Sequence, residues 1–246
     1  MMHTGIVGFV IIAINFLCSY KGFNDRVFFD KYKFEVDKIL IHKEYYRLLT
    51  SSFLHVDWQH LIFNMLSLYF FFELVELQLG VMPFLILYFA SMVGGDLLAL
   101  FIHRNHGDYS AVGASGAVCG IIFASIALFP ELGIGIFLLP FSIPSWLYGI
   151  LYIAFTIYGI KSGRDNIGHE AHLVGALIGL LTAIILYPAS LTENYIPILI
   201  VFIPCTVFIY LIITKPYILL IDNNFFNSHR KKYYSIEDKY LSLIHI

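Results

Sequence analysis

The chain has 246 residues, of which 59% are hydrophobic and only 13% are charged, and its formal net charge at pH 7 is −2. Soluble globular domains carry about 25% charged residues, so this composition excludes an ordinary soluble protein and requires most side chains to face lipid or other apolar helices. The small net charge argues neither for nor against a nucleic-acid partner, and we expect none. The three cysteines all lie in apolar runs and form no spaced framework.

Seven apolar runs along the chain are each about as long as a transmembrane helix, which needs roughly 20 mostly apolar residues. They lie near residues 5–20, 58–79, 82–102, 114–130, 145–161, 169–188 and 195–214. We interpret the first run as a retained helix rather than a signal peptide, because no Lys or Arg precedes it and no small-residue cleavage site follows it. The sequence therefore predicts an all-α polytopic membrane protein.

The positive charges are divided unevenly between the connecting segments. All 15 Lys and Arg residues fall after the first, third and fifth runs or in the tail. With seven spans these segments lie on one side of the membrane, so the one-sided count supports the seven-span layout. By itself, the positive-inside rule would place that side in the cytoplasm.

Polar residues open the second, fourth and sixth runs: His60 and Asn64 in the second, Ser115 in the fourth, and His172 in the sixth. Each lies within the first two turns of its predicted helix. Because the even-numbered spans cross the membrane in the same direction, these four residues lie at similar depth near one face. Ionisable groups inside spans are costly and usually functional. The pattern predicts one polar site built from three helices.

Two pairs of glycines, each spaced four residues apart, follow the serine and the histidine: Gly116 with Gly120, and Gly175 with Gly179. Small residues at this spacing share one helix face and let membrane helices approach closely. Taken alone, the spacing is more typical of ordinary helix packing than of a site. Since Ser115 and His172 lie just before the two pairs, packing the glycine stripes together would bring the Ser115 hydroxyl towards the His172 ring.

A serine and a histidine held together have the chemistry for acyl transfer. A neutral imidazole suits the removal of the serine proton, so His172 would act as base and later as acid for the leaving amine. The Asn64 amide, the nearby His60 and the backbone N–H groups at the start of the fourth helix can donate to the developing oxyanion. Glu170 faces away from His172 on a helix and Asp96 lies in an odd-numbered span, which favours a Ser–His dyad over a triad.

The combination of motifs resembles the rhomboid family of intramembrane serine proteases, over about residues 5–188. The motifs are Tyr46-Arg47, His60-x-x-x-Asn64, Gly113-Ala-Ser115-Gly116 and Ala171-His172-x-x-Gly175-x-x-x-Gly179. The resemblance implies Ser115 as nucleophile and His172 as base. It also implies that His60, Asn64 and Gly113 stabilise the oxyanion and substrate, that Tyr46 and Arg47 anchor the first loop, and that Gly116, Gly120, Gly175 and Gly179 pack the helices. No metal or cofactor is implied.

The resemblance also implies the domain organisation and the partners. Residues 1–190 would form the six-helix rhomboid core, 191–214 one additional C-terminal transmembrane helix, and 215–246 a polar tail. The last six residues resemble the translated end of a sequencing adapter, and we expect them to be an artefact. Substrates would be transmembrane proteins in the lipid bilayer, cut in or near their membrane segments. We expect a bacterial inner membrane with the site facing outward, against the positive-inside count.

Two positions depart from the family pattern. Tyr46 replaces a usual tryptophan, and Cys119 stands where many bacterial members have a tyrosine that packs on the catalytic histidine. Tyr46 should still anchor the loop. The orientation of the His172 ring must come from other packing.

Two other functions compete with this interpretation. The spacings His103-x-x-His106 and His169-x-x-His172, with His55 and His60, loosely resemble the histidine boxes of metal-dependent membrane enzymes. Two histidines that share a metal on one helix face are better spaced by four residues than by three. The second rival is a catalytically inactive rhomboid relative that binds membrane proteins, against which the intact Ser115 and His172 argue.

Overall fold

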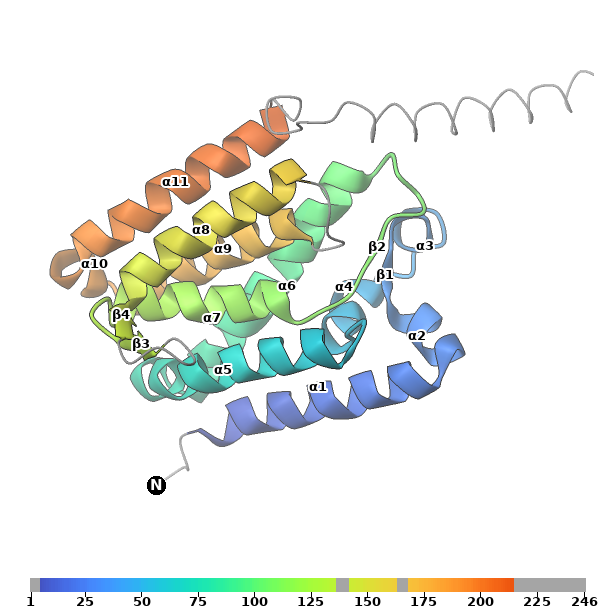
Figure 1. Ribbon diagram of the computed structural model, residues 1–246, viewed down its shortest axis with the longest axis horizontal. Helices are drawn as coiled ribbons and strands as arrows, with labels where there is room; N and C mark the ends of the chain where they lie inside the picture. Colours follow the sequence, from blue (N-terminus) through green and yellow to red (C-terminus); the bar gives the residue numbers. More distant parts are fainter. Residues whose placement is uncertain (1–4, 136–141, 163–167, 215–246) are drawn as a thin grey trace, which may run out of the picture.

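The computed structural model describes residues 5–135, 142–162 and 168–214, and the tail predicted at 215–246 lies outside this range. Within the described residues, seven helices of 14 residues or more follow the predicted apolar runs. They are α1 (Ile6–Asn24), α5 (Trp58–Leu79), α6 (Val81–His103), α7 (Ser115–Leu128), α8 (Ser145–Ser162), α9 (His169–Leu186) and α11 (Tyr195–Thr214). Figure 1 shows them arranged side by side as a bundle.

Five helices of the described chain, α1, α5, α6, α9 and α11, are long and apolar enough to cross a membrane, whereas α7 and α8 are shorter apolar helices. Large apolar side chains point outward from the long helices, such as Leu17, which is 71% exposed, and Phe63, which is 62% exposed. In water this surface would be costly, and in a bilayer it faces lipid. The chain is an all-α polytopic membrane protein, as its composition predicts.

The helix α7 lies at the centre of the bundle and packs against α5, α6 and α9. Every residue from Ala117 to Leu128 is buried, as expected for a helix that is apolar on all sides. The helix ends at Leu128 because the next residue, Phe129, precedes Pro130 and is driven out of the helical region. Its 14 residues span about 21 Å, which is less than the roughly 30 Å of a bilayer core.

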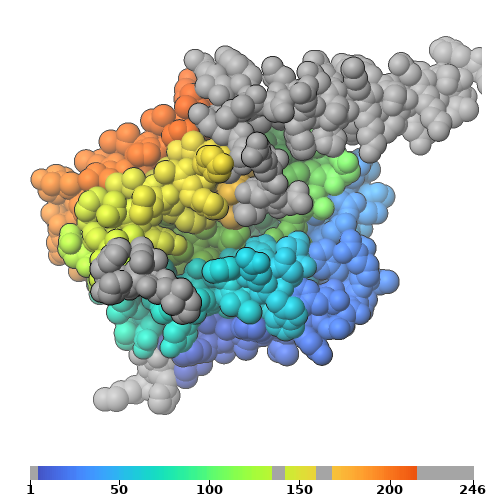
Figure 2. Space-filling view, viewed as in Figure 1, coloured from blue at the N-terminus to red at the C-terminus, as the bar shows by residue number. Residues whose placement is uncertain are grey.

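The outer helices cover this centre from two directions. α1 packs on α5, and α11 packs on α8 and α9. Figure 2 shows the side chains of α1 and α11 at opposite edges of the molecule. The additional helix predicted at 191–214 therefore corresponds to α11, preceded by the short α10 (Ser190–Glu193).

A buried carboxylate fixes the start of α1 on α5. Glu76 is fully buried, and its two oxygens accept hydrogen bonds from the backbone N–H groups of Gly5 at 2.9 Å and Gly8 at 3.4 Å. A carboxylate here complements the positive end of the helix dipole. A Cβ atom at Gly8 would overlap the Phe72 ring, so the glycine also allows the two helices to approach closely.

The first loop, between α1 and α5, is folded. It contains α2 (Arg26–Tyr32), β1 (Phe34–Glu35), α3 (Val36–Leu40), α4 (Arg47–Thr50) and the 3-10 turn η1 (Ser51–Phe53). The strand β1 pairs antiparallel with β2 (Ser110–Ala111), which immediately precedes α7. A second antiparallel pair is formed by β3 (Gly133–Gly135) and β4 (Ser142–Pro144). The first pairing ties the loop to the segment that leads into Ser115.

Glycines bring α7 and α9 into backbone contact. A Cβ atom at Gly175 would overlap the carbonyl of Gly116, and one at Gly179 would overlap the backbone of Gly120. Backbone atoms cannot turn aside as side chains can, so neither position on α9 has room for a larger residue. The two glycine pairs therefore face each other across the helix pair.

We expect Gly175→Ala to destabilise the protein by about 1–3 kcal/mol, the usual cost of overpacking, because the added methyl group meets the Gly116 carbonyl. The matched control is Gly116→Ala, whose methyl group would lie 3.8 Å from the carbonyl oxygens of Ala171 and Ser91, an ordinary contact. Thermal unfolding of both variants in detergent measures the difference. Equal stability of the two variants would contradict this account of the packing.

Candidate active site

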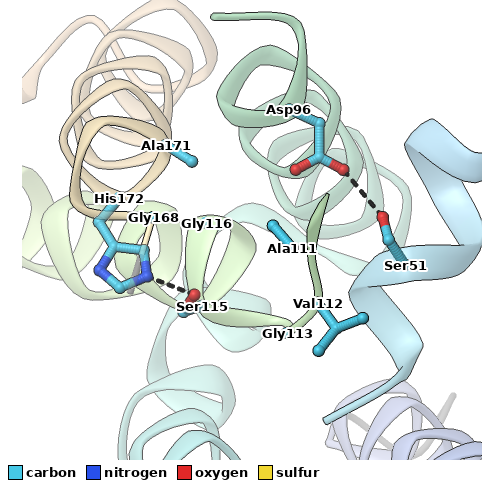
Figure 3. Close-up of a pocket in the computed structure, with 10 residues that line it drawn as sticks. All are labelled: Ser51, Asp96, Ala111, Val112, Gly113, Ser115, Gly116, Gly168, Ala171 and His172. Atoms are coloured by element: carbon cyan, nitrogen blue, oxygen red, sulfur yellow. Dashed lines mark hydrogen bonds between the residues drawn. The ribbon is translucent and has the colours of Figure 1, made fainter. Parts of the chain in front are cut away.

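Ser115 is the first residue of α7, and His172 lies in the first turn of α9. The His172 Nε2 atom lies 2.5 Å from the Ser115 Oγ atom, and Figure 3 shows the two side chains pointing towards each other. Both are half-buried. The structure thus joins two residues that are 57 positions apart in the sequence, through the close packing of the glycine stripes.

A small pocket opens beside this pair. Its lining residues come from the loop before α5, from α6, from the segment entering α7, and from the start of α9: Ser51, Asp96, Ala111, Val112, Gly113, Ser115, Gly116, Gly168, Ala171 and His172. The Asp96 carboxylate lies across the pocket and accepts a hydrogen bond from the Ser51 hydroxyl at 3.2 Å. Polar atoms therefore line the space beside the Ser115 hydroxyl, within a bundle of apolar helices.

The glycine at 113 shapes the approach to Ser115. Its φ of 132° lies in the left-handed region that favours glycine, and a Cβ atom there would come within 2.7 Å of the His60 ring. Its backbone N–H donates to the carbonyl of Ser51 at 3.1 Å. Gly113 therefore packs directly against His60, and the two lie next to the serine.

The amide of Asn64 is bonded within its own helix. Its Nδ2 atom donates to the carbonyl of His60 at 3.1 Å, which uses one of its two N–H groups. The side chain of Asp57 caps the same helix by accepting from the backbone N–H of His60 at 2.8 Å. Neither Asn64 nor His60 is among the described residues that line the pocket.

A buried histidine supports the loop that carries the serine. His55 Nδ1 lies 2.8 Å from the hydroxyl of Ser19, which itself donates to the carbonyl of Phe53. The hydroxyl must therefore accept from Nδ1–H, and this leaves Nε2 to accept the backbone N–H of Ala114 at 3.5 Å. Burial, together with the neighbouring His60, lowers the pKa of His55 to about 3, so it stays neutral. From the sequence, His55 stands out only as a possible metal ligand.

The first loop is anchored by Arg47, whose side chain is buried. Its Nη1 donates to the carbonyls of Asp30 at 2.9 Å and Lys33 at 2.7 Å, and its Nε pairs with Glu44 at 2.6 Å. The hydrogen bond from Arg47 holds the pKa of Glu44 below its ordinary value. Tyr46 is 41% exposed, and its hydroxyl donates to Glu44 at 3.0 Å. Arg47 therefore makes most of the contacts that hold the first loop, and Tyr46 adds a bond at the exposed surface.

The second ring nitrogen of His172 faces Tyr152, a residue that no sequence motif marks. The Tyr152 hydroxyl of α8 lies 3.1 Å from His172 Nδ1 and 2.7 Å from the Cys119 sulfur. The nearby carboxylates are engaged elsewhere, since Asp96 bonds Ser51 and Glu170 bonds His103 and Tyr109. No sequence signal distinguishes Tyr152 from the other aromatic residues of its apolar run.

The histidines that the sequence suggested as metal ligands make other contacts in the structure. His103 Nε2 lies 2.8 Å from Glu170, and its ring stacks on Tyr109 at 3.6 Å between centroids. The rings of His169 and His172 are 5.9 Å apart and meet edge to face. Among the described residues, no three His, Cys, Asp or Glu side chains are grouped so that they could hold a metal ion.

The chain matches known proteins over most of this region. A family model described as the Rhomboid domain matches residues 42–189. The chain is 29% identical over 192 residues to RHOMBOID-like protein 12, mitochondrial, of Arabidopsis thaliana, covering 72% of this chain and 56% of the relative.

Two further relatives match a shorter part of the chain. It is 29% identical over 150 residues to Rhomboid protein 1, mitochondrial, of Saccharomyces cerevisiae, covering 58% of this chain and 43% of the relative. It is 30% identical over 145 residues to the candidate rhomboid protease YdcA of Bacillus subtilis, covering 56% of this chain and 65% of the relative. The chain thus spans about half the length of the curated relatives that it matches.

We expect Arg47→Ala to destabilise the protein by about 1–3 kcal/mol, because it leaves the part-buried carbonyl groups of Asp30 and Lys33 without a donor. Tyr46→Phe is the control, since it removes one exposed hydroxyl and should change stability by less than about 0.5 kcal/mol. Thermal unfolding and limited proteolysis of residues 24–57 in detergent measure both effects. An Arg47→Ala protein as stable and as protease-resistant as Tyr46→Phe would show that the anchor is unimportant.

Proposed function

The chain belongs to the rhomboid family, and from this premise we propose that it is an intramembrane serine endopeptidase that cuts the membrane segments of transmembrane proteins. The observation that carries the proposal is the 2.5 Å contact between Ser115 Oγ and His172 Nε2. In this geometry Nε2 can take the serine proton, which is the step that makes a hydroxyl nucleophilic. The same contact favours an active enzyme over an inactive binding protein.

In the proposed reaction, the Ser115 oxygen attacks the carbonyl carbon of the scissile peptide bond while its proton passes to His172 Nε2. The carbonyl oxygen becomes an oxyanion, and the backbone N–H groups at the start of α7 lie at the positive end of that helix dipole. His172 then gives the proton to the leaving amine, and an acyl-enzyme remains on Ser115. Water, activated by His172 in the same way, releases the second product.

Two side chains of α5 are proposed to add donors to the oxyanion. Asn64 retains one N–H group beyond its bond to the His60 carbonyl, and the His60 ring packs against Gly113, two residues before Ser115. In this proposal, rotation of both side chains would bring them to the substrate carbonyl. Catalytic hydrogen bonds are often long in structures without substrate and tighten only in the complex.

The proposed substrates share the bilayer with the enzyme. The chain is an integral membrane protein, and a membrane segment of another protein can approach the apolar bundle without leaving lipid. The yeast and Arabidopsis relatives carry mitochondrial names and YdcA comes from a bacterium, so they do not favour the bacterial inner membrane predicted from the sequence. That location and the predicted orientation stay predictions.

The catalytic roles are tested by Ser115→Ala and His172→Ala, which should each lower cleavage of a model transmembrane substrate by at least about a thousandfold, because the two residues act as a unit. Cleavage is measured with purified protein in lipid vesicles, with thermal unfolding as the check on folding. A serine-directed mechanism-based inhibitor should add its mass to Ser115 in wild type and to neither variant. Appreciable turnover by clean Ser115→Ala protein would refute the mechanism.

A chelator separates the proposed mechanism from the metal-dependent alternative. Serine chemistry needs no metal, so cleavage should survive dialysis against a chelator such as EDTA or 1,10-phenanthroline. Activity that the chelator abolishes and added zinc or iron restores would favour the metal enzyme. Absence of cleavage together with absence of Ser115 labelling would favour the inactive relative.

The oxyanion role of Asn64 predicts a partial loss. Removing one donor costs about 2.7–4 kcal/mol in soluble serine proteases, and other donors remain here, so Asn64→Ala should lower kcat by about a hundredfold or less. Asn15→Ala is a matched control, because Asn15 makes the same bond to its own helix, to the carbonyl of Ile11 at 2.9 Å, on the outer helix α1. Wild-type kcat for Asn64→Ala would remove Asn64 from the site.

A further inference from the structure

A catalytic histidine needs a partner on the ring nitrogen that does not face the serine. A neutral imidazole has one N–H donor and one acceptor nitrogen. To take the proton of Ser115, Nε2 of His172 must be the acceptor, and then Nδ1 carries the hydrogen. In a site enclosed by apolar helices, that N–H group needs an acceptor, because an unpaired buried donor is costly.

The Tyr152 hydroxyl supplies this acceptor. It lies 3.1 Å from His172 Nδ1, on the opposite edge of the ring from Ser115. The tyrosine ring is held in place by its neighbours, since it meets Phe123 of α7 edge to face, with ring centroids 6.0 Å apart, and stacks on Tyr148 at 6.4 Å. Its position is therefore fixed by packing that does not involve the histidine.

The thiol of Cys119 completes the chain of contacts. Its sulfur lies 2.7 Å from the Tyr152 hydroxyl, and the cysteine is buried on α7, one turn after Ser115. A phenol is a good donor, whereas a thiol is a weak one, so the favoured direction has Tyr152 O–H pointing to sulfur. The Tyr152 oxygen is then free to accept from His172 Nδ1–H, and Nε2 is left to accept from Ser115.

The small side chain at 119 also makes room for the tyrosine. The sulfur and the Tyr152 hydroxyl are only 2.7 Å apart, so a larger side chain at 119 would overlap the hydroxyl. The cysteine and the contact from Tyr152 are thus two parts of one arrangement.

We infer that Tyr152, backed by Cys119, is a positioning residue that fixes the tautomer and the orientation of His172. This inference rests on the proposed function for its effect on catalysis, but the tautomer itself can be observed in the absence of any substrate. Tyr152 acts through His172 and does not touch the reacting atoms. Its loss should therefore lower kcat and leave KM nearly unchanged.

The kinetic test replaces only the hydroxyl. Tyr152→Phe keeps the ring packing and removes the acceptor, and we expect kcat to fall by about 10- to 100-fold. Tyr148→Phe is the matched control, because Tyr148 lies one turn earlier on the same helix and stacks on the same ring. It should keep wild-type kcat. Thermal unfolding of both variants shows whether either substitution disturbs the fold.

A spectroscopic test reads the tautomer directly in the unmodified protein. Solid-state nitrogen-15 NMR of histidine-labelled wild type in lipid vesicles at neutral pH should show His172 with protonated Nδ1 and unprotonated Nε2, its signal being the one absent from His172→Ala. Tyr152→Phe should lose this preference. A wild-type His172 that carries its hydrogen on Nε2 would overturn the inference, as would an unchanged tautomer and unchanged kcat in Tyr152→Phe.

The role of Cys119 is tested by a double-mutant cycle. Cys119→Ala alone should leave a working enzyme with kcat lowered by about two- to tenfold, and Cys119→Ser should restore most of the loss. In the Tyr152→Phe background Cys119→Ala should have no further effect, because the cysteine acts through the tyrosine. Independent, additive effects would show that the cysteine does not act through Tyr152.

The NMR and cleavage measurements together distinguish failure of the proposed protease function from failure of the role inferred for Tyr152. If the wild type shows the expected tautomer and cleaves no substrate, the positioning contact holds and the protease assignment falls. If it cleaves substrate and His172 carries its hydrogen on Nε2, the assignment holds and the role of Tyr152 falls.

Discussion

The backbone contact between α7 and α9 is the constraint on which the candidate site depends. At Gly175 and Gly179 there is no room for a side chain, because the backbone of α7 occupies that space. Two helices can approach this closely only where both carry small residues. The approach brings Ser115 and His172 within hydrogen-bonding distance, so a packing requirement and a chemical requirement are met by the same interface.

The length of α7 decides where that contact lies. A helix of 14 residues is too short for the roughly 30 Å core of a bilayer, so it cannot reach both membrane surfaces. Longer helices surround it, so Ser115, the first residue of α7, is enclosed by other segments of the chain. The pocket beside Ser115 is lined by residues from the first loop, α6 and α9. Polar chemistry is thereby enclosed in a protein whose outer surface faces lipid.

Buried polar groups hold the parts of this site in register. His55 joins α1 to the backbone just before Ser115, Arg47 ties the first loop to itself, and Glu76 fixes the start of α1 on α5. In an apolar surrounding, a polar group without a partner is costly. Each of these contacts therefore restricts its segment to one arrangement. Tyr152 acts on the histidine ring in the same way.

The sequence by itself determined the helices and the main pair of the candidate site. Apolar runs of about the length that a bilayer requires predicted seven helices, of which five in the described chain are long enough to cross a membrane and α7 and α8 are shorter. Span parity with glycine spacing predicted that Ser115 and His172 would meet. The family motifs led to the same pair. These features can be predicted from the sequence because each depends on the length of an apolar run, on the spacing of residues within one helix, or on the direction in which a span crosses the membrane.

Only the tertiary structure decided the partners of these residues. Tyr152 lies in an apolar run with no distinguishing pattern, and Glu76 looks like any acidic residue near the end of a span, yet each bonds a group from another helix. The folded form of the first loop and its pairing with the segment before α7 were equally unreadable. Such contacts join segments far apart in the chain, and their geometry is set by how the helices rotate and pack, which no local pattern records.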